Sequence, residues 1–549
     1  MITTLDKKTR LVLFWCIFVI LVFARVWYTW GVPIDINQDE AFAGYNTYTL
    51  IHNGKDSIGN TMPMYLTAWG SGMNALESYL AIPFVAVFGL HVWTIRIVPL
   101  LVALFSLVVI YRIGREFMKN DIFALFSLFI AGVMPWHIMI SRWALESNLA
   151  PGFLLFGLYF FLKGMEKEKY YMLSALFYGL ALYSYATIWV VLPFILLAQV
   201  LYAIVKRRLR FTRYTVIAGV ILAILALPAM LFLLVNKDII GEIRTPFFTI
   251  PKLVAFRENE ISLANIPENL KTMFHILWTQ SDGLPWNSTE EYGLLYHISA
   301  PFTISGLIAV LVPPVIRFRK WLNRGIATGN WKSKNEKKST EPGTISLSFF
   351  LIVWLLAGLV VGALISVNVN RINLIFPPLI ALTAYGLYMV FAHFTWIRER
   401  LVWLPVLVYL FMFVRFEMYY FTDYKDEVNE HFCVGIEETM NYLNNELAPF
   451  EHVIITPNIS YARVLFYDKT DLNTYLDTVE YVNYPAAYMD VSSFGRYDFT
   501  IDMDFEADGE SVYVLDHSYD ESVLVESMDK KGYMLRDFGR YVVYYPLGV

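Results

Sequence analysis

Long apolar segments alternate with short basic ones through the first 421 residues of this chain. A membrane-crossing helix needs about 20 apolar residues, and basic residues gather in cytoplasmic loops. Six basic clusters occur, at residues 7–10, 112–119, 163–169, 206–213, 317–338 and 398–400. If all six are cytoplasmic, the pattern predicts eleven spans, at residues 11–30, 94–115, 121–141, 148–163, 170–185, 188–206, 214–235, 297–317, 345–367, 371–393 and 401–421.

This arrangement places the N-terminus in the cytoplasm and predicts two long outer loops, residues 31–93 and 236–296. The apolar stretch 79–90 has only about a dozen residues, which suits an interfacial or re-entrant helix better than a span. Counting it as a span would turn the basic clusters 112–119 and 206–213 outward, against the distribution expected of basic residues. We therefore expect helices that lie along the outer face of the membrane in the first outer loop.

Composition and charge support a polytopic helical membrane protein with a separate soluble domain. The chain is 57% hydrophobic and 17% charged, with a mean hydropathy of +0.48. Residues 422–549 hold 25 acidic and 8 basic residues, a net charge of −17, whereas residues 1–421 carry +12. The residue pattern of this tail predicts a helix at 435–447 and strands at 453–455, 511–515 and 541–545. We predict a transmembrane domain over 1–421 and an acidic, extracytoplasmic α/β domain over 422–549.

An adjacent pair of acids, Asp39 and Glu40, directly follows the first span. Carboxylates beside hydrocarbon are costly and usually functional. A further acid, Glu146, follows the third predicted span, and arginines are expected at the outer ends of several spans: Arg96, Arg142 and Arg371. A carboxylate could take a proton from an acceptor hydroxyl while guanidinium groups neutralise a phosphate leaving group held on a lipid.

Structural roles for the same residues stay open at this point. Asp39 and Glu40 could cap an interfacial helix, because acids suit the first helical turn. Glu146 could pair with Arg142, four residues earlier. Arg96 could extend toward the membrane surface from the end of a span. An outer-face Arg371 runs against the usual distribution of basic residues, which favours a function for it.

A series of short motifs over residues 10–395 carries a resemblance to a known family. The motifs are Asp39-Glu40-Ala41-Phe42-Ala43-Gly44-Tyr45-Asn46, Gly54-Lys55-Asp56 with Gly59-Asn60 and Pro63, Arg96-Ile97-Val98-Pro99, Pro135-Trp136-His137 with Ser141-Arg142 and Glu146, and Asn370-Arg371-Ile372-Asn373 before Pro377-Pro378. Their order and predicted membrane side resemble the GT-C superfamily of integral membrane glycosyltransferases. Within it, the chain is similar to the bacterial branch related to dolichyl-phosphate-mannose protein mannosyltransferases and aminoarabinose transferases.

The resemblance implies an inverting transfer of a hexose or pentose from a polyprenyl-phosphate donor to an acceptor on the extracytoplasmic face. It assigns Asp39 as the catalytic base and Glu40 as a partner that orients the acceptor or tunes Asp39. Glu146 stands where relatives often have Asp. Arg371, followed by Arg96 and Arg142, is the candidate for holding the donor phosphate. The expected partners are the donor and membrane lipids, with the acceptor left open between a cell-envelope glycan, a lipid and a protein, and no nucleic acid.

Cofactor and loop expectations complete this interpretation. Some relatives hold a divalent cation between acids, and Asp39 or Glu146 could ligate Mg²⁺ or Mn²⁺. Because arginines already supply positive charge, we expect no metal and no other cofactor. The loop 236–296 is too long for a simple connector. Candidates for acceptor binding or a lid are Asp282 and Trp286 in that loop and Trp69 in the first outer loop.

Two other functions compete with catalysis. A transporter or flippase of lipid-linked sugars could also use charges among many spans, and a structural scaffold could use the soluble tail. Transporters often show internal repeats and charges near the middle of the membrane. This chain shows no obvious repeat, and its key charges collect at one face, so we favour catalysis.

Overall fold

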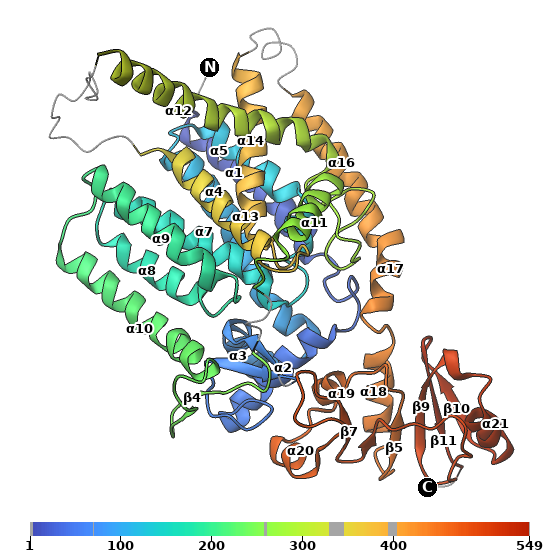
Figure 1. The fold of residues 1–549 in the computed structure, drawn as a ribbon. Helices are drawn as coiled ribbons and strands as arrows, with labels where there is room; N and C mark the ends of the chain where they lie inside the picture. The colour runs from blue at the N-terminus through green and yellow to red at the C-terminus, as the bar shows by residue number, and fades with distance from the viewer. Residues whose placement is uncertain (1–3, 70, 257–260, 329–344, 394–402, 548–549) are drawn as a thin grey trace.

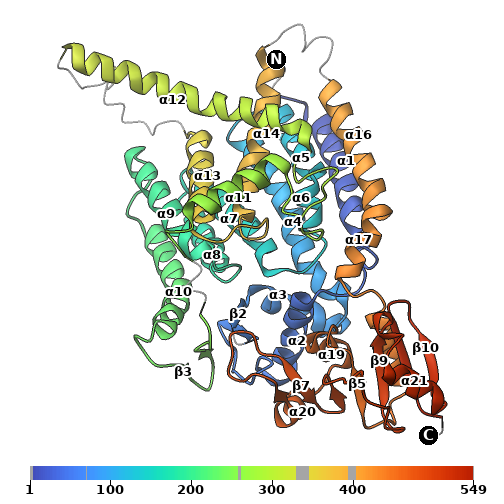
Figure 2. The same cartoon turned by 45° about the vertical axis from the view of Figure 1, so that its right-hand side comes forward.

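The computed structural model describes residues 4–547 except residues 70, 257–260, 329–344 and 394–402. A bundle of helices forms most of the molecule, and a smaller domain with a β-sheet packs against one end of it (Figure 1). The N-terminus lies at the opposite end of the bundle from this domain in both views (Figures 1 and 2). Two parts of the basic pattern that predicts the orientation lie outside the described residues: residues 329–338 of the cluster 317–338, and the whole cluster 398–400.

Every predicted span contains a helix of the bundle. The helices are α1 (Lys7–Val26), α4 (Val92–Glu116), α5 (Asp121–Val133), α6 (Pro135–Met139), α7 (Glu146–Gly164), α8 (Tyr170–Ala181), α9 (Ile188–Val205), α10 (Arg213–Asn236), α12 (Ala300–Thr328), α13 (Leu347–Leu364), α14 (Phe376–His393) and α16 (Leu404–Phe421). Among the described helices, seven are long and apolar enough to cross a membrane. The prediction of a polytopic helical membrane protein is confirmed, and the count of eleven crossings stays a prediction.

Two predicted spans differ in detail from the helices. The span 121–141 is divided into α5 and α6 at Met134, because Pro135 has no backbone N–H to continue the helix. The span 170–185 holds a helix of only 12 residues, α8, which is about 18 Å long. The hydropathy pattern marks where apolar chain lies but does not mark where a helix bends or stops.

The loop 31–93 folds as a compact unit at one end of the bundle. It contains α2 (Gln38–Asn53), an antiparallel hairpin of β1 (Tyr65–Ala68) and β2 (Ser71–Asn74), and α3 (Leu76–Phe88). Helix α3 covers the stretch expected not to cross the membrane, and it lies beside α2 in both views (Figures 1 and 2). The loop 236–296 contains β3 (Ile243–Arg244), β4 (Thr249–Ile250) and α11 (Ile266–Thr279).

The C-terminal domain is an α/β unit, as the tail pattern predicts. Its sheet has seven strands in the order β10-β11-β9-β5-β8-β7-β6, with β5 parallel to both of its neighbours. The strands are β5 (Val453–Ile455), β6 (Glu480–Tyr481), β7 (Val491–Phe494), β8 (Tyr497–Asp498), β9 (Val512–Asp516), β10 (Met534–Asp537) and β11 (Tyr541–Tyr545). The helices are α17 (Asp423–His431), α18 (Ile436–Asn445), α19 (Tyr461–Asp468), α20 (Leu472–Thr478) and α21 (Val523–Lys530).

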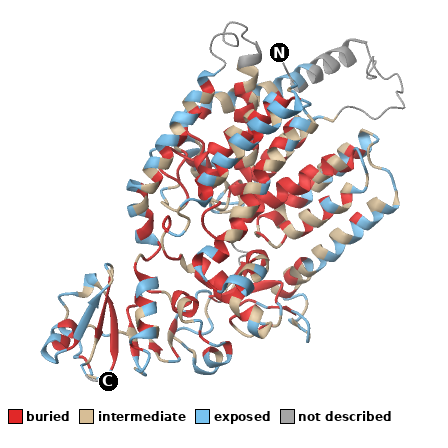
Figure 3. Ribbon diagram, turned by 180° about the vertical axis from the view of Figure 1, so that it is seen from behind, coloured by how far each residue is buried: buried red, intermediate tan, exposed pale blue. Residues whose placement is uncertain are grey.

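Buried side chains run without a break from the bundle through α2 into the C-terminal domain (Figure 3). Helix α19 lies so close to α2 that the motif of residues 39–46 needs a glycine, Gly44, at the point of contact. A Cβ atom on Gly44 would lie 2.5 Å from the ring of Phe466 on α19. The C-terminal domain is therefore packed directly on the helix that begins with the acid pair.

Candidate functional site

The acid pair lies in the first turn of α2, where Asn37 caps the helix. The side chain of Asn37 accepts a hydrogen bond of 2.9 Å from the N–H of Asp39, and the carboxylate of Glu40 accepts one of 3.2 Å from the N–H of Asn37. This reciprocal pattern is a capping box, which fixes where the helix begins. The carboxylate of Asp39 is only partly buried, whereas Glu40 has no exposed surface. The two neighbouring acids therefore have different surroundings.

Glu40 is held in a buried ion pair with Arg96 of α4. The guanidinium donates from Nε to Oε1 and from Nη2 to Oε2, both at 2.9 Å. The N–H of Ala144, between α6 and α7, donates to the same carboxylate at 2.6 Å. Glu40 therefore joins three segments of the chain. These bonds indicate a structural role for Glu40, and its predicted role in orienting the acceptor or tuning Asp39 stays a prediction.

Arg96 has no N–H left for a donor phosphate. Besides Glu40, its guanidinium donates to the carbonyl oxygens of Thr29, Pro33 and Asp35 at 3.2, 2.7 and 2.8 Å. These bonds hold the segment between α1 and α2 against α4. The placement favours a structural role for Arg96, and its assignment to phosphate binding stays a prediction.

The guanidinium of Arg142 likewise donates its hydrogen bonds to the protein backbone. Its five N–H groups donate at 3.0–3.2 Å to the carbonyl oxygens of Ala24, Arg25, Trp27, Tyr28 and Val32. Ala24 and Arg25 lie in the last turn of α1, where helix carbonyl groups lack partners within the helix, and Trp27, Tyr28 and Val32 lie in the segment that follows it. The aromatic rings of Tyr420 and Phe421 cover the guanidinium. These contacts favour a structural role for Arg142 as well, and its assignment to the donor phosphate stays a prediction.

Glu146 begins α7 and is partly buried beside the first loop. It accepts a hydrogen bond from the backbone N–H of Asn74, at the end of β2. Close to it lies Glu77 of α3, an acid that the sequence analysis did not single out. Glu77 is 3% exposed, and burial followed by the charges of Glu40 and Glu146 raises its pKa well above the ordinary value. In the sequence, Glu77 could have been recognised as the lone acid of the apolar segment 76–88.

Arg371 is the one arginine of the three with an accessible position. It lies in the turn between α13 and η3 (Asn373–Ile375) and is partly exposed. Its backbone N–H bonds Asn368 at 2.9 Å, and its guanidinium contacts the hydroxyl and carbonyl of Ser366. A partly exposed guanidinium is within reach of an anion that approaches from outside. Of the three predicted arginines, Arg371 is therefore the most accessible one, and its role in holding the phosphate stays a prediction.

The segment 279–287 supports the turn that carries Arg371. The carboxylate of Asp282 accepts hydrogen bonds from the N–H of Val369 at 2.9 Å and from the side chain of Asn287 at 2.8 Å. Trp286 packs its ring against His431 of α17. The geometry gives Asp282 a role in shaping this turn, which differs from direct contact with an acceptor. Trp69 lies elsewhere, beside α2.

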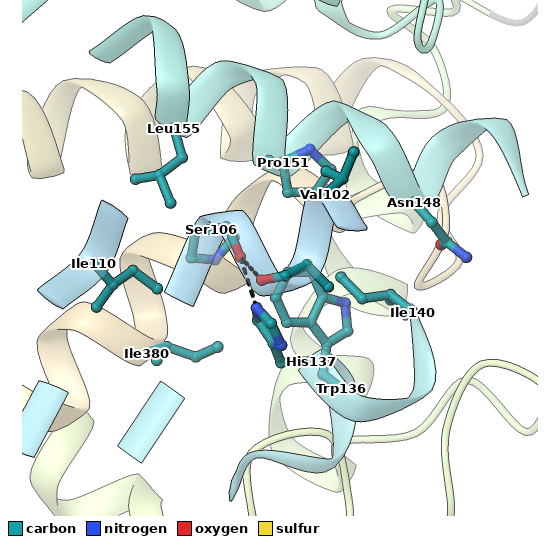
Figure 4. A pocket seen from close by; sticks show the side chains of 13 residues that line it. Val102, Ser106, Ile110, Trp136, His137, Ile140, Asn148, Pro151, Leu155 and Ile380 are labelled. Atoms are coloured by element: carbon teal, nitrogen blue, oxygen red, sulfur yellow. Dashed lines mark hydrogen bonds between the residues drawn. The ribbon is translucent and has the colours of Figure 1, made fainter. Parts of the chain in front are cut away.

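A small apolar cavity of about 30 Å³ lies inside the bundle (Figure 4). Asn148 lies at one end of it, two residues after Glu146, and Trp136 lies nearby with its indole N–H bonded to Asn373 at 3.0 Å. Inside, His137 bonds Ser106 at 2.9 Å. The cavity adjoins a groove of about 330 Å³, and the two share the apolar residues Ile110, Leu155, Pro377 and Ile380. The apolar lining of this groove suits part of a hydrocarbon chain.

Asp35 and Arg463 attach the C-terminal domain to the same region. The carboxyl of Asp35 accepts hydrogen bonds from the N–H groups of Gly435 and Glu437 at 2.6 and 3.3 Å, at the N-terminus of α18. Burial raises the pKa of Asp35 to about 7, although the bond from Gly435 acts in the opposite direction. Arg463 of α19 donates to the carbonyl of Ile36 at 3.0 Å. Both contacts lie within four residues of Asp39.

The acids of the described residues are spread over different elements. Within the described ranges, no group of three or more His, Cys, Asp or Glu side chains is arranged to hold a metal ion. Of the two acids that could serve as ligands, Glu146 is bonded to the backbone of Asn74 and Asp39 lies on a different element. The side-chain geometry therefore offers no preformed cation site in the described part of the chain.

Comparisons with known proteins agree with this architecture. Residues 76–242 match the family model described as dolichyl-phosphate-mannose-protein mannosyltransferase. The structure of ArnT from Cupriavidus metallidurans bound to undecaprenyl phosphate matches with a TM-score of 0.51 and 14% identity, covering 98% of each chain. An archaeal oligosaccharyltransferase, AglB from Archaeoglobus fulgidus in complex with an inhibitory peptide and a dolichol-phosphate, aligns with a TM-score of 0.46 and 12% identity, covering 84% of this chain and 64% of AglB. No curated protein sequence matches the chain. At such identities the likeness to ArnT establishes the fold.

Proposed function

We propose that this protein, a membrane glycosyltransferase of the GT-C type, transfers a sugar from a polyprenyl-phosphate-linked donor to a hydroxyl group on the extracytoplasmic face. The observation that carries the proposal is the apolar groove of about 330 Å³ with the small cavity that adjoins it. Asn148, which lines the cavity, is two residues from Glu146, and Trp136, which also lines it, bonds Asn373, two residues from Arg371. A long isoprenoid chain needs such a space, and its phosphate needs a cation at the mouth. The ArnT structure with undecaprenyl phosphate supports the lipid class of the donor.

Asp39 acts as the general base in this proposal. Its carboxylate takes the proton of the acceptor hydroxyl, and the acceptor oxygen forms a bond to the anomeric carbon from the side opposite the phosphate. The bond between that carbon and the phosphate oxygen breaks, so the sugar configuration is inverted and the lipid phosphate leaves. Arg371 stabilises the negative charge that develops on the phosphate. Because a guanidinium can supply this charge, we propose that no divalent cation is required.

Membrane orientation forms part of the same proposal. We place the N-terminus in the cytoplasm and α2 with the C-terminal domain outside, following the distribution of basic residues. The −17 charge of residues 422–549 and their location at the opposite end of the molecule from the N-terminus support this placement (Figure 1). All proposed reacting groups then face the side on which flipped lipid-linked sugars are presented.

The function is tested by incubating the purified protein with a panel of polyprenyl-phosphate sugars and candidate acceptors and identifying products by mass. We expect one donor to lose its sugar with formation of an inverted glycoside. Lipid-linked sugars that cross vesicle membranes without any transfer of the sugar would show that the protein is a transporter instead.

Arg371→Ala is expected to raise the KM for the donor about tenfold to a hundredfold, because the lipid phosphate loses its cation. Arg371→Lys should restore part of the affinity through charge alone. Initial rates at varied donor concentration measure the effect. Arg244→Ala is the control, since Arg244 is 71% exposed and pairs with the neighbouring Glu242. An unchanged donor KM in Arg371→Ala would assign the phosphate to another group.

A further inference from the structure

A loop of the C-terminal domain reaches the N-terminal end of α2. Residues 482–490 join β6 to β7, and the N–H of Met489 donates to the carbonyl of Trp69 at 3.0 Å. The loop is closed by a bond of 2.9 Å from the N–H of Val482 to the carbonyl of Asp490 and by one of 2.8 Å from Asn483 to the carbonyl of Tyr488. Its position beside the first loop is therefore fixed by its own bonds and by Trp69.

Tyr488 stacks on Trp69 in a nearly parallel arrangement. The ring centroids are 5.6 Å apart and the interplanar angle is 2°. Trp69 also packs on Phe42, one turn after Asp39 in α2, and is only 8% exposed. Tyr488, by contrast, keeps 53% of its surface exposed. The stack thus presents an open aromatic face next to α2.

The polar edge of Tyr488 points to the first turn of α2. Gln38 donates to the phenol oxygen at 3.4 Å. Burial, followed by the charge of Asp39, raises the pKa of the phenol. The open ring, a side-chain amide and the carboxylate of Asp39 therefore lie together, although they come from two domains.

The contacts between the two domains do not by themselves explain why the ring of Tyr488 is exposed. The bonds of Asp35 and Arg463, together with the packing of Phe466 on Gly44, already join the C-terminal domain to α2. A ring serving only that purpose would be buried like its neighbour Met489, which is 5% exposed. An aromatic face beside hydrogen-bonding groups suits a ligand with both apolar C–H faces and hydroxyl groups.

We propose that Tyr488 is an acceptor-binding residue, so that the C-terminal domain completes the active site, and that the acceptor is a saccharide. Its pyranose ring packs on the exposed face of Tyr488, its hydroxyls bond Gln38, and one hydroxyl lies beside Asp39 for deprotonation. The −17 charge of residues 422–549 disfavours a polyanionic acceptor, so the saccharide is neutral or cationic. This inference rests on the proposed glycosyl transfer.

The test uses the full-length protein with the donor identified from the panel and with n-octyl glycosides or a serine- and threonine-containing peptide as acceptors. We expect the wild type to use glycosides and Tyr488→Ala to raise the glycoside KM about tenfold. The donor KM and the slow hydrolysis of donor by water should stay unchanged. Tyr488→Phe should keep most of the affinity, because the ring face remains.

Phe505→Ala is the matched control, since Phe505 is a 68% exposed aromatic residue elsewhere in the same domain. Thermal melting of each variant separates lost binding from lost folding. An unchanged glycoside KM in Tyr488→Ala, or a wild type that glycosylates the peptide and no glycoside, would overturn the inference. A wild type that neither transfers nor hydrolyses any donor would refute the proposed function itself, which is a distinguishable result.

Discussion

Replacing Asp39 with asparagine is expected to slow sugar transfer by about 10²- to 10⁴-fold, the usual contribution of a general base. Asparagine has nearly the same shape but cannot take a proton from the acceptor hydroxyl. The start of α2 does not depend on this carboxylate, because the cap is formed by Asn37 and Glu40. The variant should therefore fold normally and keep its affinity for the donor. Single-turnover rates at saturating donor and acceptor measure the effect.

The control for this experiment is Glu268→Gln, which neutralises a 70% exposed acid on α11. We expect the control to have the wild-type rate. A wild-type rate in Asp39→Asn would show that the base is another group, and Glu146→Gln would then be the next variant to measure. Loss of donor affinity in Asp39→Asn would indicate that Asp39 contributes to binding and not to proton transfer.

The bundle could be predicted from the sequence because the membrane allows few alternatives. In hydrocarbon every backbone N–H and C=O must be paired within the protein, so an apolar segment of sufficient length becomes a helix. This is why each of the eleven predicted spans holds a helix. The C-terminal domain was predicted from alternating and periodic patterns, and its predicted helix and strands match α18, β5, β9 and β11.

The partners of the buried charges could not be predicted in the same way. The arginine at position 142 was visible in the sequence, but its partners are backbone carbonyl groups, which carry no sequence signature. A bond between Gln38 and Tyr488 joins residues 450 positions apart. Such contacts depend on how the domains pack, so the sequence identified the acid pair but not the residues that surround it.

Removing one member of the Glu40–Arg96 pair is expected to lower the free energy of unfolding by about 3–5 kcal/mol, because the other charge is left buried without a partner. The pair is almost wholly excluded from solvent, with 0% and 2% of the side chains exposed. Either Glu40→Ala or Arg96→Ala should show the loss. Denaturant unfolding in detergent, followed by tryptophan fluorescence, measures it. Transfer activity should fall along with stability, since α2 carries Asp39.

The same variants separate a structural role of Arg96 from the phosphate-binding role that the sequence suggested. If Arg96 binds the phosphate, Arg96→Ala should raise the donor KM and leave the protein stable. If Arg96 is structural, the same substitution should mainly lower the free energy of unfolding. The exposed ion pair of Arg244 and Glu242 serves for comparison, since Arg244 is 71% exposed. Glu242→Gln should lower the free energy of unfolding by less than about 1 kcal/mol. Replacing Glu40 and Arg96 together with methionine should recover part of the stability, because no unpaired charge remains buried. A stable Arg96→Ala variant with a raised donor KM would return Arg96 to the phosphate site.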